Sequence, residues 1–449
     1  MRAAFYTFGC KLNQYETEAL ASAFRNQGFS VVSLHEGCLQ ESDVYLINTC
    51  TVTSKSEQKA RRLIRALSRG HPDSLLVVTG CYAQCDGEAV RALGPNIVVV
   101  PQARKDALLD FPLFLKRVDG GGGEGRRDLA REYFARLDAS AGDPFRFRVA
   151  SYSFHSRAFL KIQDGCDNAC AFCRVPLARG GSVSLEPERV YERLQEIERA
   201  GYREAVLTGV NISSYRCGGL RLPELLAEAL ARSTSLRIRL SSLEPEAVSP
   251  PLAEVLKEPR LRPHFHLPVQ SGSDRVLAAM RRGYTAAKVE EAVDMLRAAK
   301  PGAFLAADLI VGFPGESEED FTLTLDLAAR LRFAKLHVFP FSPRPGTPAW
   351  GLGGRVPERV RDQRVRRLVD LCERLYRLYA EQWRGREVEM VLEGRQAHGG
   401  GEGWRGLSEN YLKILVGGVP GALARSGGLV RVRIDDIGAV CRGSFLAGA

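Results

Sequence analysis

The amino-acid sequence predicts an α/β protein in three parts: an N-terminal open parallel α/β domain, a central partial (β/α)6 barrel and a small C-terminal all-β barrel. Three observations predict it. Short apolar strands alternate with amphipathic helices over about the first 110 residues, and about six further β/α repeats follow residue 157. The end of the chain is rich in glycine and short alternating strands. A chain of 449 residues also exceeds what one hydrophobic core normally supports.

The N-terminal domain is predicted to cover residues 1–118. Its strands are expected at residues 3–8, 44–48 and 75–79, and its helices at 17–27 and 54–69. Ser54 is the predicted N-cap of the second helix, with Glu57 three residues later. Strands that alternate with helices predict a parallel sheet with right-handed crossovers.

A linker is predicted at residues 119–150, because residues 119–125 form a flexible glycine run. The central domain follows at 151–383. Its strands are expected at residues 159–163, 205–208, 236–240, 264–268, 304–311 and 335–341, with helices such as 187–200, 273–280 and 318–332 between them. In such a partial barrel, function is expected at the carboxyl ends of the strands.

Residues 357–383 predict a long basic helix, and residues 384–449 a small β-barrel of the binding type. The barrel strands are expected at 388–392, 411–416 and 429–434. Between residues 355 and 386, ten arginines oppose five acids, which is half of the chain's net charge of +10. This favours a polyanionic partner, with phosphate contacts centred on residues 361–367. The alternative is a solvated helix face.

The composition is ordinary for a soluble globular protein, with 45% hydrophobic and 26% charged residues. No stretch is long and apolar enough to span a membrane, and the first residues lack a signal-peptide pattern. We therefore expect a cytoplasmic protein without a membrane partner. In that compartment thiols stay reduced, so clusters among the eleven cysteines indicate metal binding or catalysis rather than disulfides.

Three cysteines within eight residues follow the first central strand, in the segment 163–173 (QDGCDNACAFC). Cys166 and Cys170 are at most about 13–14 Å apart even in an extended chain, so a loop can bring them together with Cys173. Three thiolates can hold a 4Fe-4S cluster and leave its fourth iron open to the amino and carboxylate groups of S-adenosylmethionine. Structural zinc, the alternative, normally has four protein ligands, and no fourth Cys or His lies nearby.

A second set, Cys10, Cys50 and Cys81, is dispersed in the sequence, yet each cysteine directly follows a predicted strand. Those strand ends lie along one edge of a parallel sheet, where ligands bind in open α/β folds. We expect a second three-ligand 4Fe-4S cluster there. Cys85 is an alternative ligand to Cys81, and buried structural cysteines are the simpler explanation.

For the cofactor pocket, positions at the strand ends are the candidates: Phe172, Gly209, Asn211, Glu244, Gln270, and Gly312 to Glu316. No side chain is predicted to be catalytic, because the seven histidines form no triad pattern. The chemistry is assigned to the clusters and the cofactor.

Eight segments resemble the methylthiotransferase family of radical S-adenosylmethionine enzymes, and the match covers nearly the whole chain. They are 7–13 (TFGCKLN), 47–53 (INTCTVT), 80–84 (GCYAQ), the Cys166 motif, 207–212 (LTGVNI), 267–272 (LPVQSG), 312–316 (GFPGE) and 407–411 (LSENY). The last is similar to the family's RNA-binding TRAM domain. The 207–212 and Cys50 segments are most similar to the branch that acts on threonylcarbamoyladenosine.

The resemblance implies that the chain adds a methylthio group to C2 of N6-threonylcarbamoyladenosine at position 37, in the anticodon loop of tRNA. It implies that the Cys166 cluster donates the electron that splits S-adenosylmethionine. The deoxyadenosyl radical formed then abstracts the C2 hydrogen, and the Cys10 cluster supplies sulfur methylated by a second S-adenosylmethionine. A flavodoxin or ferredoxin is the expected electron donor.

Sister branches of the family act on isopentenyladenosine or on an aspartate of a ribosomal protein, and both remain alternatives. A non-enzymatic iron–sulfur RNA-binding sensor is a further one. This chain has Leu177 and Gly181 where relatives commonly carry Tyr and Arg. Whether the loop that carries Leu177 and Gly181 contacts the substrate is therefore an open question.

Overall fold

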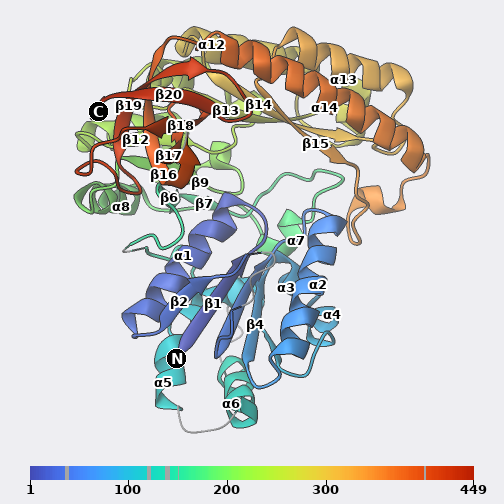
Figure 1. The fold of residues 1–449 in the computed structure, drawn as a ribbon. Helices are drawn as coiled ribbons and strands as arrows, with labels where there is room; N and C mark the ends of the chain where they lie inside the picture. The colour runs from blue at the N-terminus through green and yellow to red at the C-terminus, as the bar shows by residue number, and fades with distance from the viewer. Residues whose placement is uncertain (36–39, 119–122, 137–141, 150, 399–400, 449) are drawn as a thin grey trace.

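The computed structural model describes residues 1–449 apart from 36–39, 119–122, 137–141, 150, 399–400 and 449 (Figure 1). It confirms the predicted fold class. A parallel α/β domain forms the lower part of the molecule in Figure 1, and a central curved array of parallel strands lies above it. A closed five-stranded barrel and the long helix α14 (Glu358–Glu381) lie at the top.

Five parallel strands form the N-terminal sheet in the order β2-β1-β3-β4-β5. The middle strands β3 (Val44–Thr49) and β4 (Leu75–Gly80) are buried along their whole length, because apolar clusters cover both faces of the sheet. The remaining elements are β1 (Arg2–Thr7), β2 (Ser30–Ser33), β5 (Ile97–Val99), α1 (Lys11–Asn26), α2 (Ser54–Gly70), α3 (Cys81–Cys85), α4 (Gly87–Arg91), η1 (Gln102–Leu109) and α5 (Phe111–Arg117).

The N-cap of α2 differs from the prediction. Thr53 is the cap, and its hydroxyl accepts a hydrogen bond from the Ser56 amide at 3.2 Å. Ser54 is the first helical residue, and its hydroxyl lies 2.8 Å from that of Ser342 in the central domain. The prediction of Ser54 was wrong because either residue fits the local capping pattern, and the partner of Ser54 is 288 positions away.

The segment expected to be a linker contains regular structure. Helix α6 (Gly123–Ala135) lies within it, and the rings of Phe145 and Phe147 are buried in the neighbouring cores. Of the predicted glycine run, residues 119–122 lie outside the described part of the chain. Residues 137–141 and 150 also lie outside the described part. Phe145 and Phe147 thus anchor the described end of this segment to the two domains that it joins.

Six parallel strands form the central domain as two sheets, β12-β9-β6 and β13-β14-β15. Bridges from Ile238 to Leu261 and from Ser242 to His266 join the sheets, so the strands follow one another as in a partial barrel. The strands are β6 (Ala158–Lys161), β9 (Glu204–Thr208), β12 (Arg237–Leu240), β13 (His264–Gln270), β14 (Phe304–Val311) and β15 (Lys335–Pro340).

Amphipathic helices cover the outside of these strands and bury the largest apolar cluster of the molecule. They are α8 (Pro187–Arg199), α9 (Leu222–Arg232), α10 (Pro250–Leu256), α11 (Asp274–Ala279), α12 (Ala286–Ala299) and α13 (Glu318–Arg330). Shorter elements shape the strand ends: β7 (Gln163–Asp164), α7 (Val175–Arg179), β8 (Val183–Ser184), η2 (Ile212–Ser214), β10 (Arg216–Cys217), β11 (Leu220–Arg221), η3 (Pro245–Ala247) and η4 (Pro348–Gly351).

The C-terminal barrel closes in the order β16-β17-β18-β20-β19. Closure leaves no edge strand to pair with another chain. The strands are β16 (Glu387–His398), β17 (Gly401–Ser408), β18 (Lys413–Gly417), β19 (Leu429–Asp436) and β20 (Cys441–Gly448). Arg262 fastens the barrel to the central domain, because its guanidinium donates to Glu204 at 3.0 Å and to Glu389 of β16 at 2.7 Å.

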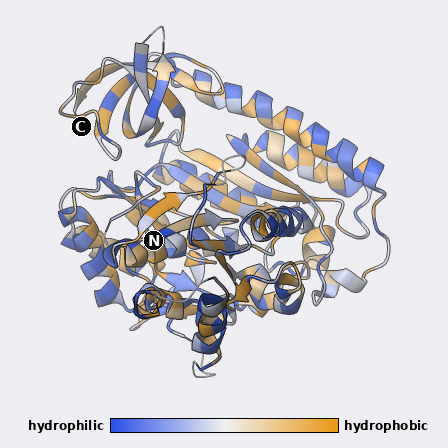
Figure 2. Ribbon diagram, turned by 60° about the horizontal axis from the view of Figure 1, so that its bottom comes forward, coloured by the Kyte–Doolittle hydropathy of each residue, from blue (hydrophilic) through white to orange (hydrophobic). Residues whose placement is uncertain are grey.

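Helix α14 is amphipathic along its length, and Figure 2 shows polar and apolar residues alternating along it. Leu368, Leu371 and Leu375 are buried on one face, while Arg366 and Arg374 are exposed on the other. No helix in the described part of the chain is long and apolar enough to cross a membrane.

Candidate metal centres and substrate site

The loop after β7 brings the first three cysteines together. Its turn is held by the Cys166 amide, which donates to Gly180 O at 3.0 Å, and by the Cys173 amide, which donates to Cys170 O at 3.2 Å. Burial raises the pKa of the Cys173 thiol to about 12, and the adjacent Cys170 and Cys166 thiols add to that rise. Three sulfur atoms therefore share one small volume at the strand ends.

Donors surround these sulfur atoms. The amides of Asn168 and Val175 donate to Cys166 Sγ and Cys173 Sγ, both at 3.4 Å. Arg282 donates to Cys170 Sγ at 3.1 Å. Amide dipoles and a cation stabilise thiolates, which are the form that binds iron. The donor set thus fits an iron–sulfur cluster.

Arg282 also joins this site to Glu244, one of the predicted cofactor contacts, through an ion pair. Burial raises the pKa of Glu244 to about 7, against the opposing effect of Arg282. No motif near Arg282 in the sequence indicated this role. Arg282 follows Arg281, whose left-handed backbone (φ 58°) turns the chain after α11 toward the cysteines.

The other predicted cofactor contacts lie around the same strand ends. The amide of Asn211 donates to Gln163 Oε1 at 2.8 Å, and a Cβ on Gly209 would lie 2.8 Å from that same oxygen, so only glycine fits there. Gln270 ends β13 with a left-handed backbone (φ 63°). Phe172 packs against the small apolar cluster that contains Phe313.

The Gly312 to Glu316 turn is held internally. The Gly312 amide donates to Glu316 Oε2 at 2.8 Å, and Arg364 of α14 pairs with the same carboxylate at 2.7 Å. Glu316 is 5% exposed. Its carboxylate therefore holds this turn and α14 together in the structure, and its contact with a cofactor stays a prediction.

The second cysteine set lies at the edge of the N-terminal sheet. Cys10, Cys50 and Cys81 follow β1, β3 and β4, which are neighbours in the sheet. Burial raises the pKa of the Cys50 thiol to about 12, and Cys10 and Cys81 add to the rise, so the three thiols are close together. Gly9 permits this approach: its φ is +100°, and a Cβ there would lie 2.7 Å from Cys50 Cβ.

Cys85 lies at the far end of the short helix that Cys81 begins. Burial raises the pKa of its thiol to about 11, and the charged groups and thiols that affect it include Cys81 but neither Cys10 nor Cys50. Cys81, by contrast, is affected by Cys10. The position of Cys81 directly after β4, the neighbour of β3, favours it as the partner of Cys10 and Cys50, and the choice over Cys85 stays a prediction.

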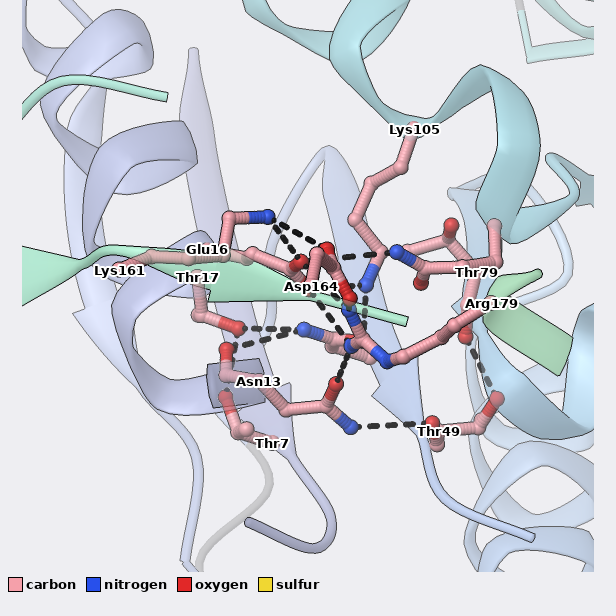
Figure 3. Close-up of polar contacts among 12 residues, drawn as sticks. Thr7, Asn13, Glu16, Thr17, Thr49, Thr79, Lys105, Lys161, Asp164 and Arg179 are labelled. Carbon is pink, nitrogen blue, oxygen red and sulfur yellow. Dashed lines mark hydrogen bonds and ion pairs between the residues drawn. The ribbon is translucent and has the colours of Figure 1, made fainter. Parts of the chain in front are cut away.

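A buried ionic network joins α1 of the N-terminal domain to β6, β7 and α7 of the central domain (Figure 3). Glu16 of α1 accepts from Lys105 Nζ at 2.6 Å, Lys161 Nζ at 2.9 Å and Arg179 Nη1 at 3.0 Å. Asp164 accepts from Lys161 and Arg179, both at 2.9 Å. Burial alone would raise the pKa of Glu16, but the three cations outweigh it and hold that pKa well below its ordinary value.

The network carries three cations against two carboxylates, and Arg179 lies close to the second cysteine set. Burial raises the pKa of the Cys81 thiol, and Arg179 and Lys105 oppose that rise. Arg179 also donates to Asn13 Oδ1 at 2.7 Å, while Asn13 Nδ2 donates to Phe8 O at 2.8 Å. The excess positive charge therefore lies beside Cys81 and favours the thiolate form of its side chain.

A cavity of about 680 Å³ lies beside the second cysteine set. It is lined by Cys10 and Lys11, by alternating residues of β13, β14 and β15, and by Tyr411 and Lys413 of the C-terminal barrel. Alternation along a strand places those side chains on one face of the sheet. The cavity thus brings all three parts of the chain to one space, of a volume typical of ligand sites.

The basic helix is only partly available to a polyanion. Arg364 is buried and pairs with Glu316, and Arg367 pairs with Glu318. Arg364 was therefore wrongly grouped with the phosphate-binding residues, because the helix face that it occupies packs on α13. The exposed arginines of residues 355–386, which include α14 and its flanks, are Arg355, Arg359, Arg366, Arg367, Arg374, Arg377, Arg384 and Arg386.

Two family models match the chain. The Radical SAM superfamily matches residues 160–328, and the Uncharacterized protein family UPF0004 matches residues 2–101. Among solved structures, the radical S-adenosylmethionine methyltransferase TsrM from Kitasatospora setae is similar, with a TM-score of 0.51 and 15% identity over 78% of this chain and 77% of that chain. This likeness supports the fold alone.

Curated relatives match over nearly the whole chain. The threonylcarbamoyladenosine tRNA methylthiotransferase MtaB of Treponema pallidum is 41% identical over 97% of this chain and 98% of its own length. The protein of the same name in Bacillus subtilis is 37% identical over 97% and 94%. A tRNA-2-methylthio-N(6)-dimethylallyladenosine synthase of Cereibacter sphaeroides is 36% identical over 95% and 94%.

Proposed function

Because this chain belongs to the methylthiotransferase family of radical S-adenosylmethionine enzymes, we propose that it adds a methylthio group to C2 of N6-threonylcarbamoyladenosine at position 37 of tRNA. The observation that carries the proposal is the near full-length similarity to relatives named for this substrate. Relatives named for dimethylallyladenosine also match at 34–36% identity, so that substrate is the alternative.

As a radical S-adenosylmethionine enzyme, the chain uses S-adenosylmethionine and a 4Fe-4S cluster. We assign Cys166, Cys170 and Cys173 as the cluster ligands. Bound there, the cluster supplies the electron for reductive cleavage of the cofactor. Arg282 stabilises the Cys170 thiolate and, through its ion pair, holds Glu244 beside it. Asn211, Gly209 and Gln270 border the same space and are the proposed cofactor contacts.

We further propose a second 4Fe-4S cluster on Cys10, Cys50 and Cys81. Its support is the convergence of these three thiols beside the excess positive charge of the Arg179 network. Such a cluster would supply the sulfur that is transferred. The residues around it hold the two cysteine sets at a fixed separation, because Glu16 lies on one domain and Lys161, Asp164 and Arg179 on the other.

Each of the three proposed domains then has a separate function. Residues 1–118 hold the second cluster, residues 151–383 hold the first cluster and the cofactor, and residues 384–449 bind RNA, with 119–150 joining the first two. Anticodon loops present unstacked bases, which proteins read readily, and the target base would leave the stack to reach the cysteines. We propose a cytoplasmic enzyme reduced by a flavodoxin or ferredoxin.

The test offers the reconstituted enzyme two tRNAs, one with threonylcarbamoyladenosine and one with isopentenyladenosine at position 37, and follows nucleosides by mass spectrometry. We expect a methylthio product from the first tRNA. Turnover of the second alone would reassign the substrate. Modification of a ribosomal protein instead would remove tRNA from the proposal, and an absence of cofactor cleavage by reduced protein would favour a sensor.

A further inference from the structure

The cavity beside Cys10 contains an unusual excess of unpaired cations. Lys11, Lys335 and Lys413 all line it. Among the residues that the structure describes, none of these three ammonium groups donates to a side chain or forms an ion pair. Elsewhere in the central domain the cations are mostly paired, as Arg262 and Arg239 are with Glu204.

The acids of the cavity do not neutralise these lysines. Asp308 Oδ1 lies 2.8 Å from His266 Nε2, so this carboxylate is already engaged. Glu373 lies at the exposed surface of α14. The lysines therefore leave a positive region that a ligand anion can enter.

A metal ion is a poor occupant of this space, although ligand atoms of His266, Asp308 and His337 lie within 4.8 Å of one another. Both ring nitrogens of His266 are already used, Nε2 by Asp308 and Nδ1 by Ser242 Oγ at 2.6 Å. Lys11 and Lys335 both act electrostatically on His337, which places two cations beside the group. A further cation is disfavoured there, and an anion is favoured.

A buried polar atom in the cavity also lacks a partner. His264 is 3% exposed, and its Nδ1 makes no hydrogen bond, whereas the His264 ring stacks on Tyr411 with 3.8 Å between centroids. Buried ring nitrogens are normally satisfied, so an unsatisfied one that lines a cavity indicates a polar group on the ligand. The cavity thus offers cations, a hydrogen-bonding nitrogen and aromatic walls together.

We infer that Lys11 and Lys335 bind the carboxylate of the N6 substituent of the target nucleoside in this cavity, and so select threonylcarbamoyladenosine over nucleosides with an apolar N6 substituent. This inference rests on the proposed function. A threonylcarbamoyl group ends in a carboxylate and a hydroxyl, while an isopentenyl group has no polar atom to pair with lysine. Lys11 directly follows Cys10, so the bound substituent lies next to the proposed sulfur-donating site.

A phosphate of the RNA backbone presents the same anionic chemistry, and the test separates the two. Synthetic anticodon stem–loops carry threonylcarbamoyladenosine, its isosteric threonine carboxamide, or plain adenosine at position 37. Their binding to the reconstituted full-length protein is measured by fluorescence anisotropy. We expect the carboxylate form to bind about 10- to 100-fold more tightly than the carboxamide, the range for a hydrogen bond to a charged group.

The Lys335→Gln variant is expected to lose most of that preference while its binding of the adenosine stem–loop stays unchanged. Lys11→Gln should act in the same way, but it adjoins Cys10, so Lys335→Gln on β15 is the decisive variant. Lys257→Gln, directly after α10, removes an exposed pair with Glu254; it is the matched control and should keep the full preference.

Two results would overturn the inference: equal binding of carboxylate and carboxamide by the unaltered protein, or an equal loss for all three stem–loops in Lys335→Gln, which would indicate a phosphate contact. Methylthiolation of the threonylcarbamoyl tRNA by the unaltered protein is scored separately. If that activity is present and the carboxylate preference survives in Lys335→Gln, the inference fails and the proposed function stands. If the activity is absent, the proposed function itself fails.

Discussion

Arg179 donates to Glu16 at 3.0 Å across the boundary between the N-terminal sheet and the central barrel, with both side chains almost completely buried. The pair belongs to a network of five buried charges, and Arg179 also acts on the nearby Cys81 thiol. Removing one member of a buried ion pair leaves the other charge buried without a partner. The resulting loss of folding stability is much larger than the net stabilisation that the pair provides.

Glu16→Gln should therefore destabilise the protein by about 3–5 kcal/mol, because Lys105, Lys161 and Arg179 then face Asp164 alone. Denaturant unfolding measures this loss. Glu132→Gln, which removes an exposed pair with Arg136, should change stability by no more than about 1 kcal/mol. Equal effects of the two substitutions would show that the network contributes nothing beyond a surface pair.

Acid should weaken the folded state through the same residue. The pKa of Glu16 is well below its ordinary value, so its stabilisation is complete above about pH 4.3 and is lost as the pH falls through the folded-state pKa. We expect the free energy of unfolding to drop below about pH 4.3, with a shallower drop in Glu16→Gln. Both proteins are compared without iron, because acid dissolves iron–sulfur clusters. An identical slope in the two proteins would contradict the assignment.

The two cysteine sets should be separable by chemical analysis. Anaerobic reconstitution should give about eight irons per chain, and replacing Cys166, Cys170 and Cys173 with Ala should leave about four and abolish 5′-deoxyadenosine formation. Replacing Cys10, Cys50 and Cys81 should also leave about four irons but spare 5′-deoxyadenosine release. Cys85→Ala is the control and should keep all eight; loss of the second cluster from it, with Cys81→Ala unaffected, would make Cys85 the ligand.

Gly9→Ala should disrupt the second cluster alone. A Cβ at this position would lie 2.7 Å from Cys50 Cβ, and the φ of +100° disfavours any side chain. Iron analysis should give about four irons per chain, with 5′-deoxyadenosine release intact. Gly201→Ala is a matched control, since its φ is +84° with nothing nearby, and it should keep about eight irons. A full iron content in Gly9→Ala would refute the assigned geometry.

Exposed arginines of α14 should bind tRNA, whereas the buried one should not. Replacing Arg366 and Arg374 with Ala should weaken tRNA binding and lower the slope of log affinity against log salt by about two, one for each phosphate contact. Filter binding across a salt series measures this slope. The exposed Arg199 of α8 is the control, and Arg199→Ala should leave the slope unchanged. A slope unaffected by the double substitution would place the RNA elsewhere.

The parts of this fold that depend on local patterns were predictable from the sequence. Periodicity placed β3 and β4 to within a residue or two, and the structure places Cys10 after β1 and Cys166 after β7, at strand ends as expected. Their role as metal ligands stays a prediction. Contacts between distant segments were not predictable. Nothing near Arg179 in the sequence indicates that it meets Glu16, 163 positions away.

Charge alone also misled the prediction for α14. Arg364 and Arg366 are the same residue type on the same helix. The packing of the helix on α13 buries Arg364 in an ion pair with Glu316 and leaves Arg366 exposed to solvent. The same limit applies to Ser54 and Thr53. Either residue can cap a helix, and the Ser54 hydroxyl instead contacts Ser342 of another domain.

The residues of the buried network are far apart in the sequence, so they emerge from the ribosome at different times during translation. Glu16 leaves the ribosome 163 residues before Arg179, which at about 5–20 residues per second is a delay of roughly 8–33 s. Throughout that interval the nascent N-terminal sheet lacks Arg179, so the buried network beside Cys81 is incomplete. The ion pairs beside Cys81 can therefore be completed only after residue 179 has been synthesised.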